Sequence, residues 1–331
     1  MKIQIMKLTY SFLLSFICFI TQAQNEFITT WEVSGNDLSI TIPTDDSNFT
    51  YDYTVDFGDD TELTNQTDDA THTYNSAGTY TVKISGTFPK FNRDIFGFDS
   101  GEITSIEQWG NIQWQSMESA FKDLYNLTIN ATDMPDLSQV SDMSRMFASA
   151  DLVNSPTISN WDVSNVTNMK ALFANANSFN QPLNDWDVSS VTNMENMFFG
   201  ADVFNQPLND WDVSNVTSML KMFSNTSVFN QPLNNWNVSN VTNMNGMFRN
   251  SSFNLPLDNW NTESVTTMRE LFFSCPYNHP LNTWDVSNVT DMQAMFRGCP
   301  FNHPLDNWNT GNVTNMVRMF LYTYFNQPIN S

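Results

Sequence analysis

Two cysteines and two histidines are the residues of this sequence best suited to metal chemistry. Cys275 and His279 stand in "CPYNHP", and Cys299 and His303 stand in "CPFNHP", 24 residues further along the chain. Two thiolates and two imidazoles form a ligand set that zinc takes in proteins. The same two cysteines would instead form a disulfide if their Cα atoms lay within about 4.4–6.8 Å of each other.

The positions of these residues favour a plainer role. Equivalent positions of neighbouring segments hold small residues in place of the cysteine, namely Ala150, Ala176, Ala201, Thr226 and Ser251. In place of the histidine they hold Gln181, Gln206 and Gln231. We therefore favour two small packed thiols and two polar turn residues over a zinc site, with a disulfide between Cys275 and Cys299 left open.

Carboxylates and amides form the second group of candidate ligands, in columns that recur along the chain. The candidate binding residues are Asp162, Asp185, Asp187, Asp210, Asp212, Asn237, Asn261, Asp285 and Asn309. Ca²⁺ prefers such oxygen ligands, but the spacing is not that of an EF-hand loop. The pattern indicates either a solvated acidic face or a ligand face, with calcium as an alternative and no cofactor required.

No catalytic constellation stands out. The three histidines, His72, His279 and His303, form no Ser/His/Asp or Cys/His arrangement, and the carboxylates recur as periodic columns rather than as one distinct pair. Acid–base catalysis needs a few groups with individually tuned environments. We predict that the protein is not an enzyme.

The columns arise because the second part of the chain is an internal repeat. Tryptophans recur at Trp161, Trp186, Trp211, Trp236, Trp260, Trp284 and Trp308. A methionine follows each tryptophan by eight residues, at Met169, Met194, Met219, Met244, Met268, Met292 and Met316. Two more degenerate units, built around Trp109 and Pro135, precede them and bring the total to nine. The interval between a methionine and the next tryptophan varies, so we expect exposed turns there.

Each unit is expected to form one coil of a solenoid. Residues 183–191 follow the pattern L-x-x-L-x-L-x-x-V, which is close to a leucine-rich-repeat strand. Val191, Met194, Met197 and Phe198 then recur at helical spacing. The predicted fold is a leucine-rich-repeat-like solenoid with one short strand and one short helix per coil. Its tryptophans and methionines would stack in a shared interior.

The repeat "FNQPLNDWDVSNVTSMLKMF" (residues 204–223) resembles the repeats of BspA-type leucine-rich-repeat surface proteins of bacteria. The resemblance covers residues 106–331. It implies an exported protein that sits on a cell surface or is released, and that adheres to proteins or other cells. It supplies no functional residue that can be transferred to this chain.

The segment 24–88 has a different composition, with short alternating runs separated by Gly and Asp turns, which is typical of a small β-sandwich. Its "VDFGDDT" and "THTYNSAGTYTVKI" resemble the PKD family of Ig-like extracellular domains, although Asp60 stands where that family usually has glycine. We interpret residues 89–105 as a linker or cap.

The first 23 residues have the pattern of a secretory signal peptide. Lys2 and Lys7 precede an apolar stretch, and small residues before Gln24 predict cleavage near Ala23. No later stretch is long and apolar enough for a membrane span. Counting 13 basic against 35 acidic residues, the chain has a net charge of −22, which disfavours a nucleic acid as partner.

Together these patterns predict a secreted or bacterial cell-surface protein that binds a protein or a glycan through the extended face of its solenoid. A structural cell-envelope or matrix component without a specific ligand is the alternative, and a glycan-binding accessory module is a second one. The sequence stops at "FNQPINS" without a polar capping repeat, so we also expect an uncapped end and end-to-end self-association.

Overall fold

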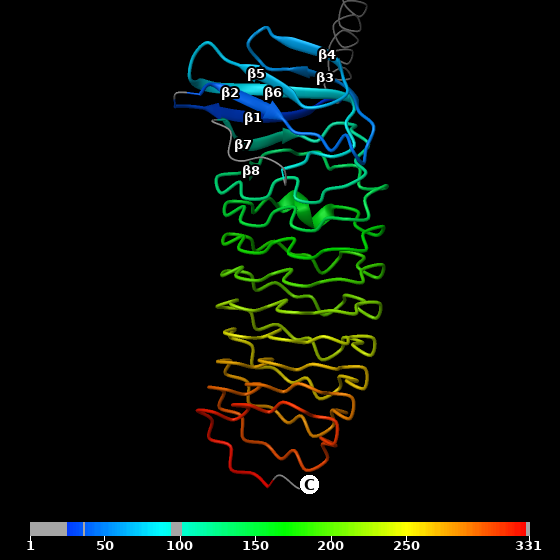
Figure 1. Cartoon of the computed structure of the whole chain (residues 1–331), viewed down its shortest axis with the longest axis vertical. Coiled ribbons are helices and arrows are strands. Elements are labelled where there is room, and N and C mark those ends of the chain that lie inside the picture. Colours follow the sequence, from blue (N-terminus) through cyan, green and yellow to red (C-terminus); the bar gives the residue numbers. More distant parts are fainter. Residues whose placement is uncertain (1–24, 36, 94–100, 329–331) are drawn as a thin grey trace, which may run out of the picture.

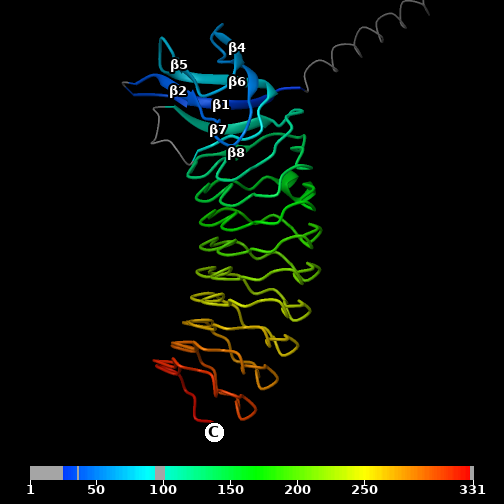
Figure 2. The same ribbon diagram turned by 45° about the vertical axis from the view of Figure 1, so that its right-hand side comes forward.

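The computed structural model describes residues 25–35, 37–93 and 101–328, and it shows a β-sheet domain at one end of a rod of stacked coils (Figure 1). The predicted signal peptide lies outside the described residues. In the view of Figure 2 the coils follow one another in chain order, each lying on the one before it.

The N-terminal domain is made of two sheets. Its strands are β1 (Phe27–Val33), β2 (Ser39–Ile42), β3 (Asp52–Asp56), β4 (Glu62–Gln66), β5 (Ala70–Thr73) and β6 (Gly78–Thr87). β2 pairs with β5, and the larger sheet has the order β4-β3-β6-β1-β7-β8, in which β7 is Gly101–Gln108 and β8 is Thr128–Ile129. Alternate residues of β1 are buried, as expected of a strand with one face on a core. The domain fits the predicted Ig-like sandwich.

The segment that we interpreted as a linker or cap extends this sheet into the rod. β7 (Gly101–Gln108) pairs antiparallel with β1 and parallel with β8 (Thr128–Ile129), which belongs to the first coils. The Phe27 ring lies 5.8 Å from the Trp109 ring and 5.2 Å from the Trp114 ring. The sandwich and the rod therefore share one sheet and one continuous core.

Each coil contains an eight-residue segment that starts at the repeat methionine, which we call a Met turn. The Met turns are residues 117–124, 143–150, 169–176, 194–201, 219–226, 244–251, 268–275, 292–299 and 316–323. In residues 169–176, the amides of Leu172, Ala174 and Ala176 donate to carbonyls three residues earlier in the same coil. The amides of Met169, Ala171, Phe173 and Asn175 donate instead to carbonyls of the next coil. This alternation satisfies the backbone without a helix or a long strand.

The alternation requires unusual backbone angles. Ala171 has φ 53° and Asn175 has φ 55°, and the equivalent positions of the other Met turns also have positive φ. Glycine fills such a position at Gly200, where an added Cβ would lie 2.4 Å from the Asn175 Oδ1 atom. Positive φ at two of every eight residues is incompatible with an α-helix.

The predicted leucine-rich-repeat fold with a helix in each coil is therefore wrong. Among the described residues, the one helical element is the short 3₁₀-helix η1 (Pro156–Asn160). The predicted strand in residues 183–191 is replaced by two turns, closed by Trp186 N–H to Leu183 C=O and Val191 N–H to Val188 C=O. Parallel pairing between coils takes place one residue before the methionine, as between Asn168 and Asn193, and it spans single residues.

The repeat side chains nevertheless form a continuous interior. The repeat tryptophans are at most 7% exposed, and the repeat methionines from Met169 to Met292 are fully buried, whereas Met316 is 41% exposed. Equivalent phenylalanine rings stack from coil to coil, with Phe198 and Phe223 centroids 5.7 Å apart. Burying each large apolar side chain stabilises the coil stack by roughly 1.5–3 kcal/mol.

Candidate functional site

The two repeat cysteines are free and buried, and each is tied to the preceding coil. The Cys275 Sγ atom donates to the carbonyl of Phe253 at 3.1 Å, and the Cys299 Sγ atom donates to that of Tyr277 at 3.0 Å. Burial raises the pKa of both thiols to about 12. Both side chains therefore stay neutral thiols near pH 7, and thiols are poor metal ligands and poor nucleophiles.

The two histidines take the place that glutamine has in other coils. His279 Nε2 lies 3.1 Å from the carbonyl oxygen of Asn254, as Gln206 Nε2 lies 3.0 Å from that of Asn180. His303 makes the equivalent contact with Asn278 at 3.0 Å. Throughout the part of the chain that the structure describes, no group of three or more His, Cys, Asp or Glu residues is placed to hold a metal ion. The Cys/His set is thus not brought together as a zinc site.

The asparagines of the "FNQP" turns form a ladder of their own. Asn180 Oδ1 accepts the backbone N–H of Asn205 at 3.0 Å, and Asn205 Oδ1 accepts that of Asn230 at 3.0 Å. An amide side chain can accept from one neighbour while its own backbone donates to another. These asparagines hold adjacent coils in register, which is a structural role.

The tryptophans from Trp186 to Trp308 also carry a polar contact that the sequence pattern did not indicate. Trp211 Nε1 donates to the carbonyl of Leu183 at 2.7 Å, and Trp236 Nε1 donates to that of Leu208 at 2.8 Å. Phenylalanine would fill a similar volume without this donor. The contact explains why the chain uses an indole at this position, since a buried carbonyl without a partner is costly.

The first candidate binding column is built into turns. The Asp187 Oδ1 atom accepts the Ser189 backbone N–H at 3.0 Å and the Ser189 hydroxyl at 2.6 Å. These hydrogen bonds lower the pKa of Asp187. Asp285 accepts the backbone N–H of Ser287 at 2.8 Å, and the pKa of Asp285 is lowered by that bond. Asp162, Asp212, Asn237, Asn261 and Asn309 accept the backbone N–H two residues on in the same way.

The second candidate column, which includes Asp185 and Asp210, is exposed and contacts neighbouring coils. The Asp210 backbone N–H donates to Asn184 Oδ1 at 3.1 Å, and the Asn184 side-chain amide donates back to the Asp210 carboxylate. In both columns the side chains lie at equivalent positions of successive coils. The columns form a regular polar surface, and in the first column one oxygen of each group serves the fold.

A shallow acidic pocket in the N-terminal domain is lined by Thr44, Asp46, Asp68 and Asp69. The Asp69 Oδ1 atom accepts the Thr44 backbone N–H at 2.7 Å and the Thr44 hydroxyl at 2.8 Å. This aspartate fixes the loop before β3. Nothing else in the pocket distinguishes it as a binding site.

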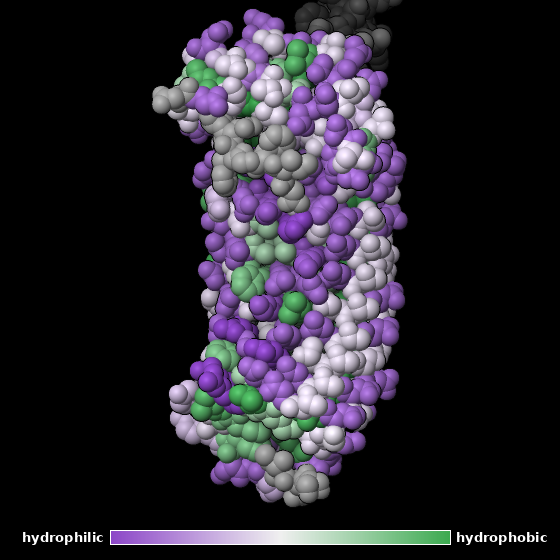
Figure 3. All heavy atoms as spheres, viewed as in Figure 1, coloured by the Kyte–Doolittle hydropathy of each residue, from purple (hydrophilic) through white to green (hydrophobic). Residues whose placement is uncertain are grey.

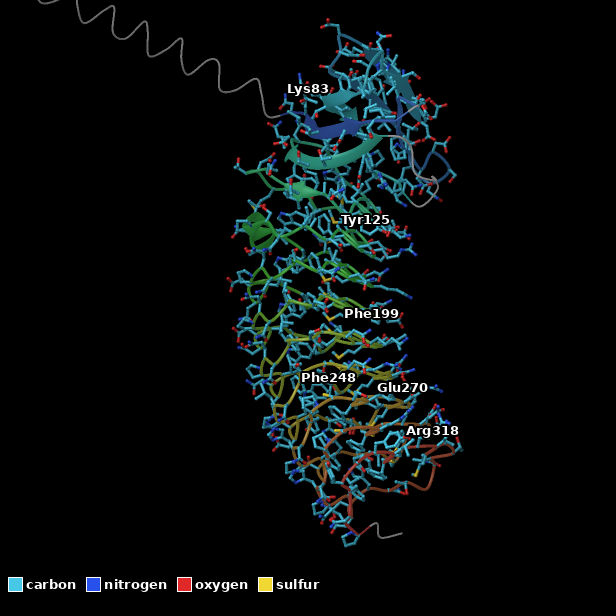
Figure 4. The ribbon with its side chains drawn as sticks, turned by 90° about the vertical axis from the view of Figure 1, so that its left-hand side faces the viewer. Lys83, Tyr125, Phe199, Phe248, Glu270 and Arg318 are labelled. Atoms are coloured by element: carbon cyan, nitrogen blue, oxygen red, sulfur yellow. The ribbon has the colours of Figure 1, made fainter. Side chains whose placement is uncertain are left out.

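Sequence reasoning missed a third column, on the outside of the Met turns. Every basic residue after position 105 lies in a Met turn, at Lys122, Arg145, Lys170, Lys221, Arg249, Arg269, Arg297 and Arg318. Each of them stands one, two or five residues after its methionine. Reading the basic residues against the repeat would have revealed this bias. In Figure 4 the outside of the Met turns lies along the right-hand edge of the rod, where Glu270 and Arg318 are labelled, and the buried Phe248 is labelled nearer the middle.

The structure also bears on the prediction of a chain without a membrane span. Within the described ranges, no helix is long and apolar enough to cross a membrane.

Comparison with known protein families identifies both parts of the chain. Residues 28–89 match the PKD domain model. Residues 115–232, 183–276, 207–300 and 250–331 match the model described as "Mycoplasma protein of unknown function, DUF285". No curated protein and no solved structure matches the chain.

The repeat model that matches is DUF285 and not a BspA-type leucine-rich repeat. The two matches are compatible with an extracellular or surface protein. Because the DUF285 matches together span residues 115–331, more than half of the chain, the protein belongs to the DUF285 family.

Proposed function

We propose that this protein is an exported, non-enzymatic binding protein that recognises a protein or a glycan on another surface through the side of its rod. The observation that carries the proposal is the coil-to-coil register. Four backbone hydrogen bonds from each Met turn to the next and the asparagine ladder fix each coil on the next, so exposed side chains at equivalent positions form straight columns. A rigid, extended surface suits recognition of a large partner, because little conformational entropy is lost on binding.

The candidate contact surface is the pair of polar columns that includes Asp187, Asp212 and Asp285. Since their Oδ1 atoms hold turns, the Oδ2 atoms and the exposed amides of the column are the groups left for a ligand. The similarity of the repeat to BspA-type surface repeats supports adhesion as the biological setting. Calcium is retained as an alternative requirement to be tested in the same assay, and end-to-end association of the rods remains a prediction.

A binding screen of the purified protein against extracellular matrix proteins and a glycan array, with and without Ca²⁺, tests the proposal. We expect saturable binding to at least one of these ligands. The variant Asp187→Asn/Asp212→Asn keeps the turn acceptors while removing two charges, and it should weaken binding if the polar columns make the contact. No binding in either condition would contradict the proposal and favour a structural envelope or matrix component.

A further inference from the structure

A separate face of the rod carries the positive charge of an otherwise acidic molecule. We call the outward side of the Met turns from residue 219 onward the cationic face. Its five Met turns hold five basic residues against one acidic residue, Glu270, a net charge of +4. The four preceding Met turns hold three basic and three acidic residues, so they are neutral. The positive charge is therefore concentrated on the C-terminal half of one face.

Two of the four arginines of the cationic face, Arg249 and Arg297, lie over aromatic rings. The guanidinium of Arg249 lies 4.6 Å from the centre of the Phe273 ring, and that of Arg297 lies 5.0 Å from the same ring. Arg297 also lies 5.9 Å from the Tyr322 ring. Stacking of this kind orients a guanidinium while its N–H groups remain directed outward. Successive coils are 5.8 Å apart at the Phe248, Phe272 and Phe296 rings, so the charges follow one another coil by coil, at three different positions of the Met turn.

Three of these cations are not neutralised by the fold. Lys221, Arg297 and Arg318 have no carboxylate within ion-pair distance among the residues described. Arg249 and Arg269 both contact Glu270. Figure 3 shows a largely hydrophilic rod surface with smaller hydrophobic patches among the hydrophilic side chains. Arginine beside an aromatic ring is a combination enriched at binding surfaces.

The backbone of this face limits the class of ligand. In the Met turns of residues 219–299, forward-pointing amides are paired with the next coil, as in Phe248 N–H to Leu271 C=O and Phe272 N–H to Met295 C=O. A peptide strand would need free backbone groups to add itself to the face. What the face offers is a row of cationic side chains, which recognises a ligand by its charges.

We propose that the cationic face binds a linear anionic polysaccharide that lies along the rod axis. Its carboxylate or sulfate groups would pair with Lys221, Arg297 and Arg318. The ammonium group of the lysine and the paired N–H donors of each guanidinium group form charge-assisted hydrogen bonds with such anions. The acidic remainder of the protein does not prevent this, because charges more than about 8 Å away are screened at physiological salt. The inference rests on the proposed binding function, and it adds a site on a different face from the polar columns.

The test compares two variants of equal net charge. Lys221→Gln/Arg297→Gln/Arg318→Gln removes the three unneutralised cations. Lys83→Gln/Lys122→Gln/Lys170→Gln removes three surface cations elsewhere and serves as the control. Binding to polygalacturonate, dextran sulfate, neutral dextran and poly-glutamate is measured at two salt concentrations, and thermal unfolding verifies that both variants fold.

We expect the unmodified protein to bind a polyanionic polysaccharide more weakly as salt increases, and to ignore neutral dextran. The first variant should bind about tenfold more weakly, at roughly 0.5 kcal/mol per ion pair, while the control changes less than twofold. Comparing the affinity for polygalacturonate with that for dextran sulfate shows whether the face prefers carboxylate or sulfate groups.

Three results would overturn the inference: no binding to either polyanion, an equal loss in both variants, or binding of poly-glutamate alone. If the protein binds a matrix protein or a neutral glycan that the first variant binds equally well, the proposed function stands while this inference fails.

Discussion

At the scale of single residues, the repeat is explained by which atoms each side chain can offer to the next coil. Trp211 supplies apolar area and one donor, and Asn205 supplies an acceptor for the next coil. Asp187 closes a turn through one oxygen. Each of these side chains makes a specific hydrogen bond as well as filling space. The repeat therefore consists of residues that hold the coils together, and few of them are reactive.

The turn role of Asp187 can be tested by substitution. We expect Asp187→Ala to destabilise the rod by about 1 kcal/mol, because the Ser189 N–H loses its acceptor. Asp187→Asn should cost less than about 0.5 kcal/mol, because Asn237 makes the same bond in another coil. Urea unfolding measures both. Equal losses in the two variants would show that the charge of Asp187 matters more than its hydrogen bond.

The two buried thiols give a second prediction at this scale. Because burial raises the pKa of Cys275 and Cys299 to about 12, almost no thiolate is present at pH 8. We expect neither cysteine to react with iodoacetamide in the native protein, and both to react in 6 M guanidinium chloride, as followed by mass spectrometry. Rapid native modification of either residue would contradict the packing described.

The same thiols predict in which direction the stability of the folded protein changes with pH. Their pKa in the folded state lies above the value of about 8.5 for an unfolded thiol. The folded chain therefore retains these protons between about pH 8.5 and 12, where the unfolded chain releases them. The free energy of unfolding should fall as pH rises through this window, and less so in a Cys275→Ala/Cys299→Ala variant.

At the scale of elements, the Met turn shows why part of the fold was predictable and part was not. Met169, Leu172, Phe173 and Ala176 face the interior, and this spacing is the same as that of one face of a helix. The spacing of the apolar residues alone therefore cannot distinguish a Met turn from a helix. The difference lies in where the Ala171 and Phe173 amides donate, and their acceptors are some 24 residues away in sequence.

A local signal against the helix was present in the chain. Asn175, Gly200, Asn225 and Asn250 occupy one position of successive Met turns, and Asn and Gly are the residues that most readily adopt positive φ. Fixed spacing allowed the in-register stack to be predicted, and two local motifs allowed the PKD-like domain to be recognised. The cationic face escaped notice because single basic residues at different positions do not form a repeat by eye.

Backbone conformation in the Met turn predicts an unusual effect of glycine. Ala171 has φ 53°, and Gly246 fills the equivalent position of another coil. We expect Ala171→Gly to stabilise the protein by about 0.5–1 kcal/mol, because an L-residue is strained there. Ala174→Gly, three residues on and without positive φ, should destabilise it by about 0.5–1 kcal/mol. If thermal unfolding showed that both glycine variants lose stability, as they would in a helix, the turn geometry would be contradicted.

At the scale of the whole molecule, a small ion cluster joins the sandwich to the rod. Lys90 Nζ lies 3.2 Å from a carboxylate oxygen of Asp45 and 3.2 Å from one of Glu118 in the first Met turn. Burial would raise the pKa of Asp45, but hydrogen bonds from Asn48 and Lys90 outweigh it, so the pKa is lowered. Arg145 also contacts Glu118, which extends the cluster to the second Met turn.

The importance of this junction is testable at Lys90. Lys90→Met leaves the Asp45 carboxylate without its cation and leaves Glu118 with Arg145 alone, and we expect a loss of about 3 kcal/mol in stability near pH 7. The deficit should shrink as pH falls through the lowered pKa of Asp45, because the protonated group no longer needs the cation. Lys83→Met removes a half-exposed pair with Asp56 and should cost less than about 1 kcal/mol. Similar losses in both variants would mean that the cluster does not couple the two parts.

The one-way hydrogen bonding of the Met turns also gives the rod an electrical direction. At each junction four Met-turn amides donate toward the following coil, as Met194, Asn196, Phe198 and Gly200 do, whereas a threonine amide outside the Met turns, such as Thr217 N–H to Thr192 C=O, donates backward. Aligned peptide dipoles add, and here their positive pole points toward higher residue numbers, the reverse of an α-helix. The positive pole of this backbone dipole thus lies toward the same half of the rod as the surplus of arginine and lysine.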